Sequence, residues 1–145
     1  PGRIEIVARA PTIVLDVAHN PASIEALLDV VNQRWPKRRK VLVFASSQDK
    51  DFAGMLRLVV PAFDAIVLTR YIHNPRAAAP AELLAAASET GVNSRPIETA
   101  DDPASALARA RQLAGPDDLL CITGSFFLAA ELRPRLLEDK VERKG

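Results

Sequence analysis

The sequence predicts an α/β fold of three layers, in which a mostly parallel sheet of about six strands carries helices on both faces. One observation is that short apolar runs, rich in β-branched residues, alternate with longer segments whose apolar residues recur at helical spacing. Such alternation is typical of parallel strands joined by right-handed helical crossovers, as in Rossmann-like domains. A second observation is that polar residues follow the apolar runs, as expected where strands end in loops: Asp16, Ser46, Thr69, Thr99 and residues 123–125.

The predicted strands are residues 3–8, 12–16, 41–45, 65–68, 96–99 and 119–123. The first alternates apolar and polar residues, whereas 12–16 and 119–123 are largely apolar and are typical of strands buried on both faces. The connection between the first two strands, around Ala10-Pro11, is too short for a helical crossover. We therefore expect these two strands to pair antiparallel at one edge of the sheet.

The predicted helices begin at recognisable caps. Asn20-Pro21 and Asp102-Pro103 each place a good N-cap before a proline at the first helical position, and Asp51 precedes a third helix. Gly91 is expected as the C-cap of another. The helices are expected at 21–34, from Phe52 to at or just before Pro61, from Pro80 to the C-cap Gly91, from Pro103 to the stop at Gly115-Pro116, and at 126–137. Residues 1–137 then form one domain and 138–145 a charged, frayed tail.

Bulk properties restrict the class of protein. With 145 residues, 48% of them hydrophobic, the chain is long enough for one domain with a full core, and no apolar run approaches a membrane span in length. The net charge of +1 favours neither nucleic acid nor a membrane as partner. The single Cys121 excludes an internal disulfide and, with no signal peptide, indicates the cytoplasm. The chain begins Pro1-Gly2 without an initiator Met, so we expect a piece of a longer protein.

Common motifs that hold a nucleotide or a metal ion are absent from the sequence. None of the six glycines precedes a lysine, so there is no P-loop, and there is no GxGxxG. Two histidines and one cysteine do not make a zinc cluster. We therefore predict no metal ligand within this chain.

The most informative segment is TIVLDVAHNPA, residues 12–22. Its apolar run predicts a buried strand, which delivers Asp16 and His19 into the turn before a helix that Asn20 is suited to cap. A turn of this kind lies at the carboxyl edge of the sheet. Open α/β folds bind their ligands at that edge.

DVAHNP, residues 16–21, closely resembles the DxAHNP motif that opens the C-terminal domain of folylpolyglutamate synthases and dihydrofolate synthases, which belong to the Mur-ligase superfamily. Four further segments resemble that family in order and spacing: PGR at 1–3, DKD with GML at 49–56, NPRA at 74–77, and TGS with FFL at 123–128. The resemblance covers residues 1 to about 133. Five matched segments in order are far more specific than one hexapeptide.

The resemblance implies an activity. In such enzymes ATP phosphorylates a folate or dihydropteroate carboxylate to an acyl phosphate, the amine of L-glutamate attacks it, and phosphate leaves as the amide forms. The P-loop and the Mg²⁺ ligands would lie on an N-terminal ATPase domain of the same polypeptide, and the C-terminal domain would close over ATP. This chain alone is therefore expected to be inactive as an ATP-dependent ligase of folate biosynthesis.

The resemblance also suggests roles for individual residues. Arg3 and His19 would be catalytic, facing the nucleotide or the transferring phosphoryl group, where positive charge stabilises the transition state. Asp16 would accept hydrogen bonds from nucleotide hydroxyls, and Asn20 would join Asp16 and His19 in the nucleotide site. Ser125, at a helix N-terminus, would bind the glutamate carboxylate through its hydroxyl and the backbone amides.

Structural explanations exist for the same residues. Asp16 and Asn20 are also the residues that a turn and a helix cap require, Ser125 can simply cap the last helix, and Arg3 can be a solvated strand residue. Lys50 is interpreted as part of a structural DKD cap rather than as a ligand residue.

Other polar and basic positions have similar alternatives. A substrate role for Asn74 and Arg76, on a polar loop, is weaker than a structural one. The basic connection 37–40 lacks interleaved aromatic residues, so we interpret it as solvated rather than as a nucleic-acid surface. Cys121 is interpreted as inert core.

An alternative function for the whole chain is a non-catalytic α/β module that binds a small anion or a partner protein. A P-loop and acidic magnesium ligands upstream in the complete gene would favour the ligase. An unrelated upstream domain would favour the module.

Overall fold

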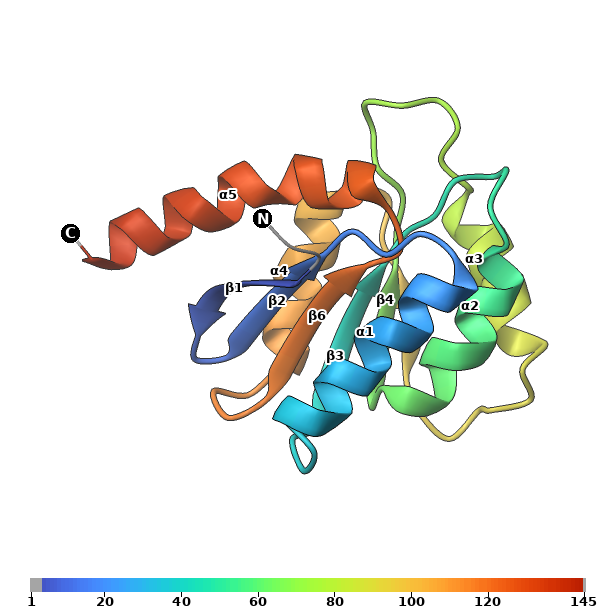
Figure 1. Ribbon diagram of the computed structural model, residues 1–145. Coiled ribbons are helices and arrows are strands. Elements are labelled where there is room, and N and C mark those ends of the chain that lie inside the picture. The colour runs from blue at the N-terminus through green and yellow to red at the C-terminus, as the bar shows by residue number, and fades with distance from the viewer. Residues whose placement is uncertain (1–3, 145) are drawn as a thin grey trace.

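A computed structural model of the chain describes the backbone of residues 4–144 and the side chains of residues 4–139. Within it, six strands form one sheet in the order β1-β2-β6-β3-β4-β5 (Figure 1). The pairs are parallel except for β1 with β2. The strands are β1 (Ile4–Arg9), β2 (Thr12–Asp16), β3 (Lys40–Phe44), β4 (Ala65–Leu68), β5 (Ile97–Thr99) and β6 (Leu119–Thr123). The predicted sheet, including its antiparallel edge strand, is confirmed.

The order of the strands follows from their composition. Every residue of β2, β4 and β6 is buried, and these strands lie inside the sheet, where helices cover both of their faces. The strands at the two edges, β1 and β5, contain partly exposed residues. The short connection between β1 and β2 contains a cis Ala10-Pro11 peptide, and the pairing of the two strands shifts register between Ile6 and Ala8.

Five α-helices cover the sheet, and the predicted N-caps start three of them. Asn20 accepts from the backbone N–H of Ser23 at 2.8 Å, Asp51 from Gly54 at 2.9 Å, and Asp102 from Ser105 at 2.7 Å. The helices are α1 (Pro21–Arg34), α2 (Phe52–Val59), α3 (Pro80–Ser88), α4 (Pro103–Leu113) and α5 (Phe126–Lys144), and a short 3₁₀ turn, η1 (Val60–Ala62), follows α2.

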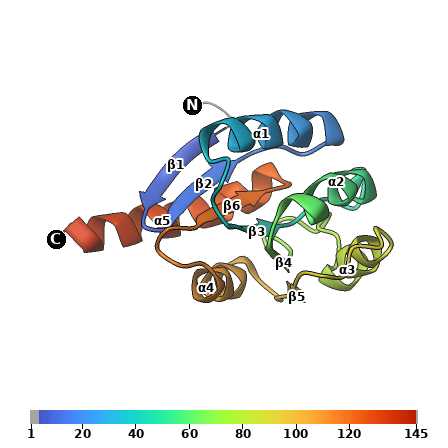
Figure 2. The same cartoon turned by 90° about the horizontal axis from the view of Figure 1, so that it is seen from below.

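The helices divide between the two faces of the sheet, which gives the three predicted layers (Figure 2). The apolar residues of α1, α2 and α3 pack against one set of alternating strand residues, which includes Val14, Leu42 and Cys121. Those of α4 and α5 pack against the opposite set, which includes Ile13 and Val43. Because successive strand side chains point to opposite faces, each strand contributes to both cores.

Two predicted helix ends are wrong. Helix α5 continues to Lys144, whereas the sequence predicted its end at 137. The segment 138–144 is rich in good helix formers, and an ion pair of 2.7 Å between Asp139 and Arg111 attaches it to α4. The C-cap of α3 is Glu89 rather than Gly91, which follows two residues later with a φ of +78°.

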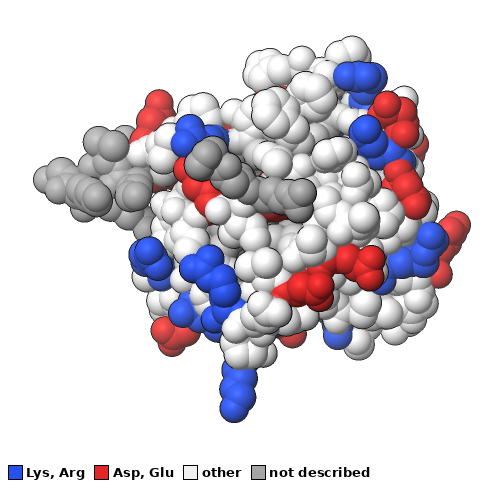
Figure 3. All heavy atoms as spheres, viewed as in Figure 1, with Lys and Arg blue, Asp and Glu red and all other residues white. Residues whose placement is uncertain are grey.

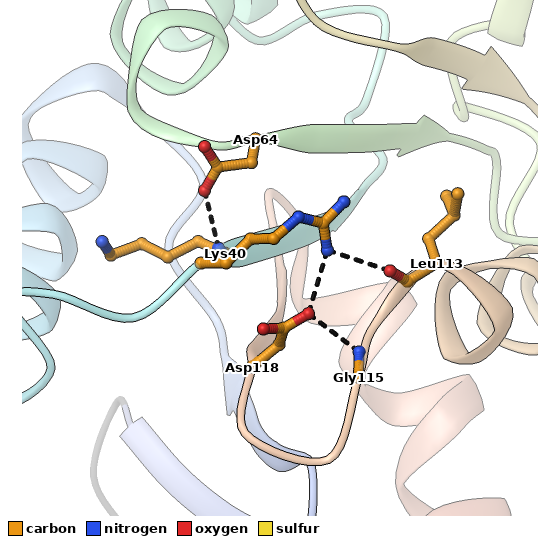
Figure 4. A network of polar contacts seen from close by, with 6 residues as sticks. Lys40, Asp64, Leu113, Gly115 and Asp118 are labelled. Atoms are coloured by element: carbon orange, nitrogen blue, oxygen red, sulfur yellow. Dashed lines mark hydrogen bonds and ion pairs between the residues drawn. The ribbon is translucent and has the colours of Figure 1, made fainter.

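At the amino ends of the strands, charged side chains are bound to one another and to the backbone (Figure 4). The Arg39 guanidinium donates to the Asp118 carboxylate at 2.9 Å, and that carboxylate also accepts from the backbone N–H of Gly115 at 2.8 Å. Asp64 accepts from the backbone N–H of Lys40 at 2.8 Å. These bonds connect three of the loops that precede strands, so the basic segment 37–40 has a structural use. On the face seen in Figure 3, basic groups likewise lie among acidic ones rather than in one patch.

Candidate functional site

Four loops meet at the carboxyl edge of the sheet, following β2, β3, β4 and β6 (Figure 1). They surround a hollow of about 220 Å³, which we call the edge hollow. Pockets that enclose drug-sized ligands measure roughly 300–1,000 Å³, so the edge hollow suits a phosphate group or an amino acid. Its lining consists of His19, Ser47, Asp49, Lys50, Arg76, Gly124, Ser125, Phe126 and Phe127.

Asp16, the last residue of β2, lies beneath the surface at this edge, with 1% of its area exposed. Its Oδ2 accepts from the backbone N–H of Ala18 at 2.8 Å and from the Thr123 hydroxyl at 3.1 Å. These bonds join the turn after β2 to the end of β6. Burial, together with the charge of Asp16, raises the pKa of the Cys121 thiol, which therefore remains protonated in the core.

The next residues of the motif are exposed. The Nδ1 of His19 lies 3.2 Å from the carbonyl oxygen of Val17, a contact that directs the ring, and His19 lines the edge hollow. Asn20 is the N-cap of α1, where its Oδ1 accepts from both the backbone N–H and the hydroxyl of Ser23. Capping occupies the amide oxygen of Asn20, so its NH₂ group is what a ligand would contact.

The loops after β3 and β4 are joined to each other. The backbone N–H of Gln48 donates to the carbonyl of Arg76 at 2.7 Å, and that of Ala78 donates to the carbonyl of Ser46 at 2.8 Å. This pairing brings Lys50 of the DKD segment and Arg76 of the NPRA segment to one hollow, although they are far apart in sequence. Within residues 4–139, neither of these two side chains takes part in an ion pair.

The turn after β6 needs glycine. Gly124 has a φ of +107°, and a Cβ there would lie 2.2 Å from the carbonyl oxygen of Ala45 and 2.7 Å from the Phe44 ring. Its backbone N–H donates to the carbonyl of Ala18 at 3.1 Å, which holds this turn against the one after β2. The chain therefore passes directly from β6 into α5 at the edge hollow.

Ser125 caps the start of α5, since its Oγ accepts from the backbone N–H of Phe127 at 3.0 Å. The residue is 3% exposed, and the small exposed part faces the edge hollow. A serine hydroxyl that accepts one hydrogen bond can still donate its own hydrogen. The first amides of a helix also carry partial positive charge. This end of the hollow therefore suits a carboxylate or a phosphate oxygen.

Of the predicted site residues, the structure brings His19 and Ser125 together in the edge hollow. Asn20 lies beside His19 as the cap of α1, and Asp16 lies below the turn. Arg3, predicted to be catalytic, lies outside the described residues. Lys50 and Arg76, for which the sequence favoured structural roles, also line the edge hollow. Their signal was present, because both belong to segments, DKD and NPRA, that had been matched in order.

The described part of the chain has no group of three or more His, Cys, Asp or Glu residues placed to hold a metal ion. The edge hollow itself contains one carboxylate, that of Asp49, beside the cations of Lys50 and Arg76. Such a lining does not fit Mg²⁺, which prefers several oxygen ligands. No helix within the described residues is both long and apolar enough to span a bilayer.

Comparisons of the sequence and of the structure with known proteins find the same family. Residues 2–126 match the family model described as "Mur ligase, glutamate ligase domain". The dihydrofolate synthase/folylpolyglutamate synthase of Bacillus subtilis is 30% identical over 136 residues, which cover 94% of this chain and 30% of that protein. The chain therefore spans about a third of the length of such relatives.

Solved structures agree with the sequence matches. A Mycobacterium tuberculosis folylpolyglutamate synthase complexed with ADP and AMPPCP superimposes with a TM-score of 0.84 at 35% identity, over 94% of this chain and 32% of that one. A bifunctional folylpolyglutamate synthase/dihydrofolate synthase with Mn, AMPPNP and L-glutamate bound superimposes with a TM-score of 0.74 at 27% identity, over 93% and 31%.

Proposed function

The chain belongs to the Mur ligase family, as a glutamate ligase domain, and from this premise we propose that it is the C-terminal domain of an ATP-dependent ligase that adds L-glutamate to a folate or dihydropteroate carboxylate. Its partner is an N-terminal P-loop ATPase domain of the same polypeptide. ATP phosphorylates the acceptor carboxylate, the amine of glutamate attacks the acyl phosphate, and the amide forms as phosphate leaves. The solved relative that has AMPPNP and L-glutamate bound supports this proposal.

The observation that carries this proposal is the convergence of His19, Lys50, Arg76 and Ser125 on the edge hollow from four separate loops. Lys50 and Arg76 provide two positive charges against the one carboxylate of Asp49. Both substrates of the second half-reaction, glutamate and an acyl phosphate, carry negative charge beside the reacting atoms. Positive groups held in position stabilise such charge more than water does once the site excludes water.

Within the hollow, we propose that Ser125 and the first amides of α5 bind one glutamate carboxylate. Arg76 is suited to the other carboxylate, because its planar guanidinium can donate two parallel hydrogen bonds to two oxygens. With both carboxylates held in this way, the glutamate amine is left free to attack the acyl phosphate. A positive charge on His19 or Lys50 would then favour departure of the phosphate.

On the nucleotide side, we propose that His19 and the NH₂ group of Asn20 contact the phosphates or the ribose. A nucleotide would reach the Asp16 carboxylate only if the turn above it opened, so Asp16 acts by holding His19 in place. Arg3 remains a proposed catalytic residue that, like His19, faces the nucleotide or the transferring phosphoryl group. The Mg²⁺ that accompanies ATP is assigned to the other domain.

The proposal is tested by assaying the complete polypeptide that carries this domain for phosphate release that requires ATP, glutamate and a reduced folate or dihydropteroate. The expected result is turnover that stops when any of the three is omitted. The 145-residue chain assayed alone should release no phosphate, because no P-loop is present in it. Turnover by the short chain, or turnover by the complete polypeptide that ignores glutamate, would contradict the proposal and favour the non-catalytic module.

A further inference from the structure

The segment that carries Arg76, residues 69–79, joins β4 to α3 and contains no helix and no strand beyond an isolated bridge between Ala77 and Ser47. Loops of this length at a binding edge are usually mobile unless something fixes them. Arg76 can meet a substrate held by Ser125 only if the loop keeps its position relative to α5. The residues that fix the loop therefore affect the site as much as those that line it.

One end of the loop is fixed to the loop after β3, through the backbone bonds of Arg76 and Ala78 described above. The other end is fixed at Tyr71, which is 1% exposed. Its hydroxyl contacts the hydroxyl of Ser47, and its ring lies 5.2 Å from that of Phe127, between centroids. Tyr71 thus connects the loop both to the edge hollow and to the first turn of α5.

Directly after Tyr71, the loop is attached to α5 by a carboxylate. Glu131 accepts from the backbone N–H of Ile72 through both oxygens, at 3.0 and 2.9 Å, and from that of His73 at 2.9 Å. Only an ionised carboxylate offers two acceptor oxygens and a negative charge to two adjacent amides. Glu131 does not line the edge hollow. It borders a separate hollow together with His73, Asp102 and Arg135.

We infer that Glu131 is a positioning residue for glutamate addition: its carboxylate anchors residues 72–73 to α5 and thereby holds Arg76 opposite Ser125. The inference rests on the proposed function. Glu131 and Ser125 belong to the same turn-and-helix unit, so one rigid element sets the positions of both glutamate-binding groups. Without the carboxylate, the loop would have to become ordered each time a substrate binds. The conformational entropy lost in that ordering would weaken substrate binding.

The test uses Glu131→Gln and Glu131→Ala in the complete polypeptide, with Glu138→Gln as a matched control on an exposed face of the same helix. Glutamine keeps the shape but replaces one acceptor by an NH₂ group that faces the loop amides. Hydrogen exchange of the amides of residues 71–79 is measured without substrates and with saturating glutamate and AMPPNP. The KM for glutamate, the KM for ATP and kcat are measured in parallel.

Loss of a hydrogen-bonded charge should speed exchange at Ile72 and His73 by roughly tenfold or more in both Glu131 variants. The KM for glutamate should rise about threefold to tenfold, while the KM for ATP and kcat change less than twofold. Saturating glutamate should restore protection of the loop. Glu138→Gln should match the unmodified protein in every measurement. Glu131→Gln keeps the volume of the side chain, so its exchange rates and KM values test the inference if Glu131→Ala fails to fold.

Unchanged exchange at residues 72–73 would overturn the anchor. Faster exchange with an unchanged KM for glutamate would overturn the positioning role, as would equal losses for ATP and glutamate. If the unmodified polypeptide adds no glutamate, the proposed function fails. Exchange at residues 72–73 reports on the anchor in that case too.

Discussion

Basic side chains have different surroundings at the amino edge and at the carboxyl edge of the sheet. At the amino edge, Arg39 is paired with Asp118, and Arg95 donates to three backbone carbonyls of the segment that leads into β4. At the carboxyl edge, Lys50 and Arg76 are exposed, and within residues 4–139 their side chains form no ion pair. The first group of cations holds loops together, and the second faces the edge hollow.

This difference shows that clustering in sequence is a poor guide to function here. The basic residues at 37–40 are consecutive in sequence, yet several of their groups are bound to neighbouring segments of the fold. The cations of the edge hollow are isolated in sequence and become a group only when the loops meet. A cation with a structural partner stabilises the fold, whereas one without a partner is available to an anionic ligand.

The largest expected effect distinguishes the two edges by their glycines. Gly124→Ala at the carboxyl edge should destabilise the domain by about 2–5 kcal/mol, because positive φ strains an alanine and the added Cβ overlaps Ala45 and Phe44. Gly91→Ala at the amino edge should cost only about 1–2 kcal/mol, because its φ is positive but nothing lies within 4 Å of the new Cβ. Urea unfolding of both variants measures the difference. An equal loss of unfolding free energy in the two variants would mean that the turn after β6 is no more tightly packed than a surface loop.

The next effect concerns the cations themselves. Arg76→Ala in the complete polypeptide should raise the KM for glutamate roughly tenfold to a hundredfold, the effect of losing a hydrogen bond to a charged group of about 1.5–3 kcal/mol. Stability should change little, because the side chain is exposed and unpaired. Lys37→Ala, at the amino edge, is the control and should leave both substrate dependences unchanged. A similar loss in the two variants would mean that general charge, not the edge hollow, attracts the substrates.

Ser125→Ala should have a combined effect. Loss of the hydroxyl should raise the KM for glutamate about tenfold and more than it raises the KM for ATP. Loss of the cap should also lower the free energy of unfolding by about 1 kcal/mol. Asp102→Ala, which removes the cap of α4, is the control for the stability part alone. Parallel changes in glutamate and ATP dependence would assign Ser125 to capping only.

The smallest effect is expected at the amino edge. Arg39→Ala removes a largely exposed ion pair and should lower stability by only about 0–1 kcal/mol, with the loss decreasing as salt is added. The KM for glutamate and the KM for ATP should stay the same. A tenfold rise in either KM would contradict the assignment of this edge to structure.

Much of this molecule was determined by the sequence alone. Strand periodicity, cap-and-proline pairs such as Asn20-Pro21, and the short connection around Ala10-Pro11 are local signals, and they predicted the layers, the sheet and its antiparallel edge. The DVAHNP segment and the four other matched segments predicted the family. These signals suffice because helix starts, strand burial and connection length are decided within a few residues.

Only the tertiary structure decided which side chains line the edge hollow. Asp16 has the residue type of a ligand group but is buried by a contact with Thr123, 107 residues away. Lys50 and Arg76 look like solvated side chains in sequence but line one hollow, because the backbone of one loop pairs with that of the other. The ion pair between Asp139 of α5 and Arg111 of α4 likewise joins residues 28 positions apart in sequence. Exposure and proximity are set by elements that meet only after folding, and no local pattern contains them.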